Sequence, residues 1–458
     1  MPTASSLTAL ASQAASKVNT AVGPAVATAY RCVLQRYTDS AVSFETQSIA
    51  SATGTHHIKI DRIADMVGGL FIQVDLPGLV NRQISDGHEA ILTGEEGKVA
   101  EGVVADVPYY VSQPGLAMIQ GADLRIGSTV VDSTTREFTW VWQELTQASS
   151  TAAKLNRFDY GDDTLKAQKR SRYHQRVLVP IPVFTQKLCK ALPLVGLPYH
   201  DVEVVVAFDN AAFGSSGIIQ NFNPTGFTTC VRKGQESTTK MGGALAIGTA
   251  AAASTAQVGH ADVTVALRYE AIYLADDERE KVSKASYNIE YFQFSQVHSM
   301  TGPHDGKVTV REDLNTSNGV VALYAVVRKE GAGLFDFAGA TCPVSSIQRP
   351  AITQMSLILN NSWEQYETST ADNVQLLLKN DQVMNRDYAP DKIAVLAFAP
   401  HNDQQYMGHI NFSRIDHKEL QISVDSSLAS EKYEIFVFQR AWNIRTIKAG
   451  VAGPMFAQ

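Results

Sequence analysis

Apolar and polar side chains alternate along several short stretches of the chain. In residues 70–76 the even-numbered positions are apolar, whereas Gln73 and Asp75 take the other parity. Residues 262–274 and 418–424 repeat this alternation. A period of two places one row of side chains in a core and the other in solvent or an interface, so these stretches predict half-buried strands of antiparallel sheets.

Two further stretches are apolar at both parities. Residues 202–208 (VEVVVAF) and 433–439 (YEIFVFQ) carry apolar side chains on both faces at their centres. A strand of this kind leaves neither face for water. We expect both stretches to lie inside a sandwich or beneath a partner.

Only two segments have a convincing helical pattern. Residues 134–145 offer Thr134 as an N-cap with Glu137 three positions later, followed by apolar residues on one face. Residues 276–286 offer a similar arrangement of Asp277 and Glu280. Long crossover helices are missing from the pattern, so a parallel α/β fold is disfavoured. Many short strands with Gly and Pro turns predict an all-β chain of sandwiches or jelly rolls.

A chain of 458 residues is too long for one ordinary core. We place the division at the second helix, because a fresh strand pattern follows it directly. Each part is large enough for an eight-stranded sandwich. The predicted organisation is an N-terminal arm over 1–29, a first sandwich over 30–276 with a long loop at about 209–260, a connecting helix over 277–286, a second sandwich over 287–450 and a C-terminal tail over 451–458.

Composition narrows the range of functions. The formal net charge is −7 without a long basic run, so direct binding of nucleic acid is not expected. The four cysteines form no C-x-x-C pair, which disfavours structural zinc and dithiol redox chemistry. No stretch reaches the roughly 18 to 20 apolar residues that span a bilayer. We therefore expect a soluble protein made in the cytosol, with free thiols and no membrane insertion.

The sequence offers no convincing set of catalytic or metal-binding groups. His56 and His57 are adjacent in a strand-like stretch and would point to opposite faces, which prevents joint ligation of a metal. Ser215 lacks the G-x-S-x-G arrangement of a nucleophile elbow. The glycine pairs at 68–69 and 242–243 lack phosphate-loop spacing and are interpreted as turns. We predict no catalytic residue, cofactor site or metal site.

Six segments, in the same order along the chain, resemble the major capsid proteins of nucleocytoplasmic large DNA viruses. The most distinctive are LPYHDV within residues 192–208 and NFSRID within residues 408–424. The others are AYRCVLQRYTDSAV (29–42), DRIADMVGGLFIQVDLP (61–77), ALRYEAIYLADDERE (266–280) and WNIRTIKAGVAGPMFAQ (442–458). Departures from the family pattern include RIADM, the reduced aromatic run in PVFTQKLCK and the final PMFAQ.

The resemblance implies a double jelly roll: two tandem eight-stranded antiparallel jelly rolls side by side, with a few short helices. It implies a structural subunit, not an enzyme, whose three copies form a pseudo-hexagonal capsomer that tiles an icosahedral shell. The expected partners are the chain itself, neighbouring trimers, and penton and minor capsid proteins, with an indirect link to an inner viral membrane. The expected location is the virion capsid, after synthesis in the host cytoplasm or a viral factory.

Under this resemblance the prominent polar residues have structural interpretations. Tyr199, His200 and Asp201 would satisfy backbone groups or a neighbouring jelly roll where the chain turns. Arg414 and Asp416, two apart on one face of a strand, would form an ion pair within or between subunits. Arg445 and Lys448 would contact minor capsid proteins on the inner side of the shell.

Two other functions compete with the capsid interpretation. A bicupin-like metalloenzyme would also pair two jelly rolls, but it requires an H-x-H ligand pair that none of the 11 histidines provides. A carbohydrate-binding sandwich would place an aromatic cluster on one surface, and no such cluster is evident in the sequence. Both alternatives are disfavoured.

Overall fold

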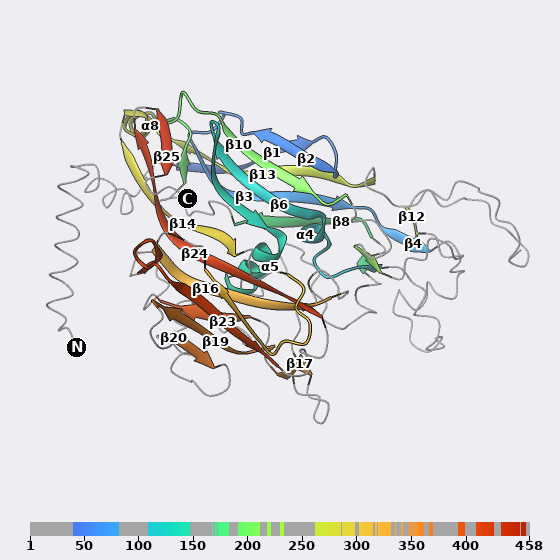
Figure 1. The fold of residues 1–458 in the computed structure, drawn as a ribbon. Coiled ribbons are helices and arrows are strands. Elements are labelled where there is room, and N and C mark those ends of the chain that lie inside the picture. Colours follow the sequence, from blue (N-terminus) through green and yellow to red (C-terminus); the bar gives the residue numbers. More distant parts are fainter. Residues whose placement is uncertain are drawn as a thin grey trace, which may run out of the picture.

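The computed structural model describes most of two packed sandwiches (Figure 1). The described residues are 40–81, 109–146, 167, 170–171, 173–182, 191–210, 218–220, 230–232, 262–284, 286–297, 302–314, 317, 319–330, 335, 340–341, 348–349, 351–360, 366–369, 393–398, 409–425, 432–448 and 450–454. The predicted arm over 1–29, most of the predicted loop over 209–260 and the last four residues lie outside this set.

The first sandwich consists of two antiparallel sheets. Sheet 1A has the order β1 (Ser40–Ile49), β13 (Thr264–Leu274), β3 (Met66–Leu76), β8 (Gln175–Ile181), and β9 (Leu192–Pro193) also pairs with β3. Sheet 1B has the order β2 (Gly54–Lys59), β10 (Val202–Phe208), β6 (Ile119–Ile126), β7 (Thr129–Thr135). The predicted strands over 70–76, 202–208 and 262–274 all lie in this sandwich.

The second sandwich is also built from two antiparallel sheets. Sheet 2A has the order β14 (Tyr287–Val297), β24 (Tyr433–Lys448), β16 (Gly319–Lys329), β21 (Ala394–Ala397), and it also includes β22 (Ile410–Asn411) and β25 (Val451–Pro454). Sheet 2B has the order β15 (Thr309–Asp313), β23 (Lys418–Val424), β19 (Ile352–Leu359), β20 (Tyr366–Ser369). The residues of β25 were predicted to belong to a C-terminal tail, but they pair with β24 instead.

The two sandwiches share one strand order. Along the main paths, the first, eighth, third and sixth strands of each sandwich form one sheet, and the second, seventh, fourth and fifth form the other. This is the order of a jelly roll, and it occurs twice in succession although the sequence has no visible internal repeat. The prediction of an all-β double jelly roll with a few short helices is confirmed.

Each sandwich encloses a hydrophobic core between its sheets. In β3 the even-numbered residues from Leu70 to Leu76 are buried in the core of the first sandwich, as the alternation predicts. In β23, Leu420, Ile422 and Val424 are buried in the core of the second. The period-two pattern therefore identified the inward face of these strands correctly.

Two glycines interpreted as turn residues lie inside strand β3. A Cβ added to Gly68 would lie 2.6 Å from Oε2 of Glu270, and the backbone N–H of Gly69 donates to that oxygen at 3.1 Å. The interpretation as a turn is wrong for this pair. Absence of a side chain lets the Glu270 carboxylate lie against the strand, a close approach that only glycine permits. The second pair, 242–243, lies outside the described residues.

Two of the helices match the sequence pattern, although the cap of one differs. Helix α5 (Arg136–Thr146) begins later than predicted, because Oγ1 of Thr135, rather than Thr134, accepts the backbone N–H of Phe138 at 3.3 Å. Helix α8 (Asp276–Lys284) directly precedes β14. Its Arg279 forms an ion pair of 2.9 Å with Asp65, which holds the helix against the first sandwich.

Short strands mark the two ends of the molecule. The pairs β4 (Leu79–Asn81) with β12 (Cys230–Arg232) and β5 (Tyr109–Tyr110) with β11 (Ile219–Gln220) lie at the end opposite α8 and β25 (Figure 1). Helix α4 (Pro114–Met118) is buried. The strands β17 (Ala340–Thr341) and β18 (Gln348–Arg349) form a separate two-stranded sheet. In the described part of the chain no helix is long and apolar enough to cross a membrane.

Candidate functional site: the junction of the two sandwiches

Sheet 2A presents apolar side chains on both of its faces. On β24, Ile435 and Val437 belong to the core of the second sandwich, whereas Phe436 and Phe438 belong to the cluster that includes the core of the first. This double face is what the pattern of residues 433–439 predicts, and the covering partner is the first sandwich of the same chain. The two sandwiches therefore pack directly on one another through an apolar interface.

Helix α5 supplies the apolar contact from the first sandwich. The ring of Phe138 lies 4.1 Å from that of Phe294 on β14 and 5.4 Å from that of Phe438 on β24, measured between centroids. The rings of Phe138 and Phe438 cross at 60°, an edge-to-face arrangement that aromatic pairs favour. Phe138, on the amphipathic face predicted for residues 134–145, is thus the residue of this helix whose ring contacts the second sandwich.

A chain of charged residues borders this aromatic contact. Arg136 pairs with Asp209 at 2.7 Å and with Glu137 at 3.0 Å, and Glu137 lies 3.9 Å from Arg328 of β16. Arg328 in turn pairs with Glu434 at 2.7 Å. Burial lowers the pKa of Arg136, but its contacts with Glu137 and Asp209 outweigh this and hold the pKa above its ordinary value. These charged residues therefore link the two sandwiches, with each arginine paired to at least one carboxylate.

A second polar group at the junction is completely buried. Arg445 of β24 is 0% exposed, and its guanidinium lies 4.7 Å from the centre of the Tyr291 ring. Burial lowers the pKa of Arg445 to about 10, partly offset by Tyr291 and by Asp132 of β7. Burial likewise raises the pKa of Tyr291 to about 12. Because Asp132 belongs to the first sandwich, this group joins the two sandwiches electrostatically.

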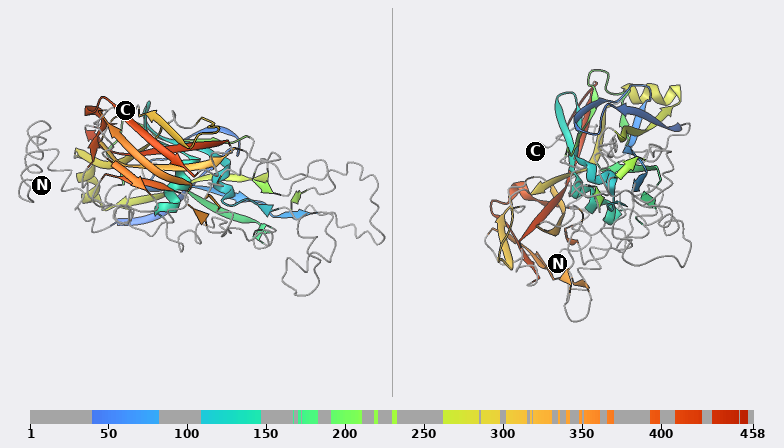
Figure 2. Two further views of the ribbon diagram at one scale, coloured as in Figure 1. Left: turned by 60° about the horizontal axis from the view of Figure 1, so that its bottom comes forward. Right: turned by 90° about the vertical axis from the view of Figure 1, so that its right-hand side faces the viewer.

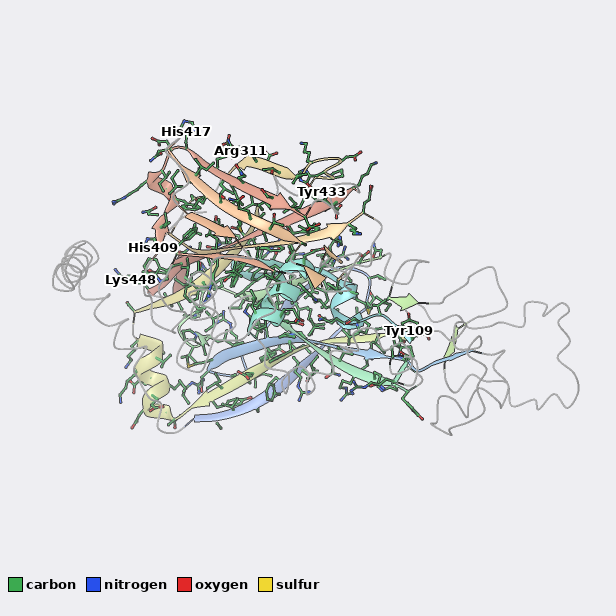
Figure 3. The ribbon with its side chains drawn as sticks, turned by 90° about the horizontal axis from the view of Figure 1, so that it is seen from below. Tyr109, Arg311, His409, His417, Tyr433 and Lys448 are labelled. Atoms are coloured by element: carbon green, nitrogen blue, oxygen red, sulfur yellow. The ribbon has the colours of Figure 1, made fainter. Side chains whose placement is uncertain are left out.

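The position of Arg445 overturns one expectation. A fully buried side chain cannot reach a minor capsid protein, so the prediction of an exposed contact is wrong for Arg445. Lys448, at the end of the same strand, is exposed (Figure 3). Asp132 and Tyr291 were missed by the sequence analysis. One signal in the sequence could have indicated the burial of Arg445: it lies two positions before the apolar Ile447, so both side chains are expected on the same face of the strand.

Tyr199, His200 and Asp201 lie where the first sandwich meets the C-terminal hairpin. The Nδ1 atom of His200 accepts the backbone N–H of Ala452 at 3.4 Å. Asp201 pairs with Lys59 at 2.7 Å, and this contact, with a smaller one from Arg62, holds its pKa below the ordinary value. These contacts support the structural interpretation of the trio: it satisfies backbone groups and touches the second jelly roll.

Tyr199 differs from its two neighbours because it is 77% exposed. Its ring lies against Gly450, where an added Cβ would be 2.6 Å from Cδ2, and Gly450 has a positive φ of 83°. The turn between β24 and β25 therefore requires glycine both for its conformation and for this contact.

Arg414 and Asp416 do not share a strand face. Residues Phe412–Arg414 form a 3-10 turn, whose N-cap Asn411 accepts the backbone N–H of Ser413 at 3.0 Å. Both Arg414 and Asp416 are exposed, and within the described residues no ion pair joins them. The predicted placement on one strand face is wrong, because the side chain of Asn411 caps a 3-10 turn that ends the strand before Arg414. A pair between subunits stays a prediction.

The structure separates the other polar residues considered in the sequence. His56 forms contacts with Ser51 and with the backbone oxygen of Thr53, and His57 lies 3.7 Å from Glu203. Among the residues that the structure describes, no three His, Cys, Asp or Glu side chains are grouped as a metal site would require. Ser215 lies outside the described residues.

Comparison with known proteins relates the N-terminal part of the chain to one family. Residues 28–227 match a family model described as the N-terminus of major capsid proteins. A search of curated protein sequences found no match to the chain.

Solved capsid proteins share the fold at low sequence identity. A PBCV-1 virus capsid model has a TM-score of 0.65 at 15% identity, covering 93% of this chain and 98% of its own. The PBCV-1 protein VP54, fitted into a reconstruction of the virophage Sputnik, has a TM-score of 0.64 at 16% identity with the same coverage. The Faustovirus major capsid protein has a TM-score of 0.56 at 10% identity, covering 90% of this chain and 92% of its own. The resemblance seen in the sequence motifs is thus supported over residues 28–227 by the match to the major capsid protein model, and the chain shares the double jelly-roll fold of solved capsid proteins.

Proposed function

We propose that three copies of this chain associate into a capsomer of pseudo-hexagonal outline, and that such capsomers tile the icosahedral shell of a large double-stranded DNA virus. The observation that supports this most directly is the repeated strand order of two sandwiches fixed side by side. Three such blocks around a threefold axis present six similar units, so one chain can occupy a hexagonal lattice.

The rigidity of the junction suits this role. A capsomer needs six units in a defined arrangement, and a flexible link between the sandwiches would blur its outline. The aromatic contact of Phe138 and the buried Arg445 group both hold the two sandwiches in one orientation. We expect contacts within the trimer to be large and apolar at the centre, roughly 2,000 Å² or more, and contacts between trimers to be smaller and more polar.

The two ends of the block are proposed to face opposite sides of the shell. The end with β4 and β12, from which the loop over 209–260 departs, is proposed to face outward, where insertions are tolerated. The end with α8 and Lys448 is proposed to face inward, toward minor capsid proteins (Figure 3). We further propose that the capsomers contact penton proteins and are linked indirectly to an inner viral membrane. The protein is proposed to be made in the host cytoplasm or in a viral factory. Residues 277–286 are proposed to be the connecting helix between the first and the second jelly roll.

Purified protein tests this proposal. Sedimentation should give a species of three times 49.7 kDa, and negative-stain images should show particles with a hexagonal outline. A monomer at the concentrations used for capsid assembly would contradict the proposal. Trimming the loop within 235–258 should leave the trimer intact, and loss of trimers in that variant would contradict the outward placement of the loop.

A further inference from the structure

Exposed apolar side chains gather at the end of the molecule that carries α8 and β25. Of the eight large apolar side chains that are exposed in the described part of the chain, four lie there: Ile63 at 62%, Val130 at 38%, Tyr199 at 77% and Val451 at 47%. We call these four residues the end patch. In Figure 1 and in the left-hand view of Figure 2, this end lies opposite the paired strands β4 and β12. An exposed apolar surface of this kind marks a contact.

Two residues of the end patch are fixed beside His200 by the first sandwich. The side chain of Arg62, the neighbour of Ile63, donates to the backbone oxygen of His200 at 2.6 Å. Tyr199 directly precedes His200 in the chain. The loop that carries Ile63 and the turn that carries Tyr199 are therefore held together.

The other two residues approach the same histidine from β25 and β7. The backbone N–H of Ala452, the neighbour of Val451, donates to the ring of His200 at 3.4 Å. Gly127, in the turn before Val130, lies against this ring, where an added Cβ would be 3.5 Å away. Strand β25 also packs beside β7. The four exposed side chains thus come from four separate segments that are fixed around one residue.

The chain enters the first sandwich at this end. Ser40, the first residue of β1, pairs with Leu274 at the end of β13. The backbone N–H of Leu274 donates at 2.9 Å to Oδ2 of Asp65, two residues after Ile63. Ser40 therefore lies close to the end patch. The 39 residues before it can span roughly 130 Å when fully extended, which is ample length to cover the patch.

The N-terminal segment, residues 1–39, has a suitable apolar row. Val26, Tyr30, Val33 and Tyr37 recur at helical spacing in the sequence. A short amphipathic stretch of this kind gains most of its stability by packing its apolar side on another surface. The end patch is an apolar surface close to the point where this segment joins the fold.

The distribution of charge favours the same placement. The N-terminal segment carries three basic side chains and one acidic side chain, whereas the whole chain has a net charge of −7. Asp276 and Asp277 are exposed in the first turn of α8, directly after the end of β13 where Ser40 is paired. Arg31 and Arg36 of the segment therefore join the fold next to an acidic surface.

We propose that the N-terminal segment covers the end patch of its own copy, with the apolar row over 26–37 against Ile63 and Tyr199. The same copy is favoured over a second one because the segment joins the fold beside the patch and needs no other chain to reach it. Such a covering involves a single chain, so it goes beyond the proposed capsomer and does not depend on it.

A photo-cross-linking amino acid at position 199 of the full chain identifies the occupant. Light and heavy isotopic copies are unfolded in urea and refolded together, and cross-links should join position 199 to residues 1–39 of the same copy. The same cross-linker at position 173 is the control. Tyr173 is also exposed, and it lies near the start of β8, which pairs with the end of β3 remote from Ser40. It should give no cross-links to residues 1–39.

Trypsin cleavage measures how firmly the segment is held. Cleavage after Arg31 and Arg36 requires the segment to leave the end patch, so its rate reports the open fraction. Ile63→Ser combined with Tyr199→Ser should raise this rate at least about fivefold, because the apolar contact is lost. Tyr173→Ser is the matched control and should leave the rate unchanged. Tyr199→Phe keeps the ring and should stay close to the unaltered protein.

The possible results separate the occupants. Cross-links between light and heavy copies would show that a second copy occupies the end patch, and would overturn the proposal. Absence of cross-links from position 199 to residues 1–39, or an equal cleavage rate in the double variant and the unaltered protein, would overturn it as well. A double variant that does not fold is replaced by Ile63→Ser alone. Sedimentation measures the trimer separately: a trimer without these cross-links leaves the capsomer proposal standing, and a monomer that shows them leaves the covering of the end patch standing.

Discussion

The ring of Phe138 on α5 lies 4.1 Å from the ring of Phe294 on β14, and this pair joins the two sandwiches. Phe138 is 2% exposed, so its removal leaves a cavity at the junction. Phe138→Ala should lower the free energy of unfolding by about 3–5 kcal/mol, as large-to-small changes in a core do. Urea unfolding measures the loss. The control Val451→Ala, at an exposed position, should stay within about 0.5 kcal/mol of the unaltered protein.

Arg445 and Asp132 should depend on one another. Arg445→Met leaves the buried Asp132 without its opposite charge, and breaking a buried pair in this way costs about 3–5 kcal/mol. Replacing both, as Arg445→Met with Asp132→Leu, should recover part of that loss because no uncompensated charge remains. Urea unfolding of the two single variants and the double variant gives the coupling. Additive effects of the two substitutions would show that the charges do not act on each other.

Much of the fold follows from local pattern. The alternation in residues 70–76 identifies the inward face of β3 because both neighbouring strands bury the same side of the sheet. The double apolar face of residues 433–439 indicates a strand covered on both sides, although it does not say by what. The strand order of the jelly rolls cannot be obtained this way, since pairs such as β1 with β13 join residues far apart in sequence.

Two of the errors share a physical cause, because each concerns a residue whose partner is distant in the sequence. Arg445 lies near the C-terminus and its sequence context is typical of an exposed basic residue, whereas Asp132 and Tyr291, both distant in the sequence, help to make its burial tolerable. The glycine pair at 68–69 is typical of a turn in the sequence, and the close approach of the Glu270 side chain from another strand explains why Gly68 lies inside β3. The local pattern identifies which face of a strand is buried, but it does not reveal which side chain, distant in the sequence, contacts that face.

His409 should make the stability of the second sandwich sensitive to acid. Its ring stacks on that of Trp442, with 5.9 Å between centroids and 19° between planes, and burial lowers the pKa of His409 below the ordinary 6.5. The folded state therefore binds the proton more weakly than the unfolded chain. The stability gained by a neutral His409 is fully present above pH 6.5 and is lost as the pH falls through the lower pKa of the folded state.

Unfolding free energies at pH 7 and pH 5 measure this effect. The His409→Gln variant should lose less stability between pH 7 and pH 5 than the unaltered protein, because it lacks the buried imidazole. The carboxylates contribute equally to the pH dependence of the two proteins. His417→Gln is the matched control, since His417 is exposed, and its pH dependence should follow that of the unaltered protein. If the His409→Gln variant and the unaltered protein lose equal stability between pH 7 and pH 5, the burial of His409 is not the cause of the acid sensitivity.

Gly319 should be needed for the same stack. A Cβ added there would lie 2.4 Å from Cδ2 of His409, far inside contact distance, and the ring cannot move away without leaving Trp442. Gly319→Ala should therefore lower the free energy of unfolding by about 1–3 kcal/mol, the usual cost of overpacking. Gly302→Ala is the matched control: an added Cβ meets nothing within 4 Å, and a methyl group there restricts the unfolded chain. Equal stabilities of the two variants in urea would show that the ring of His409 yields to the added methyl group at no cost.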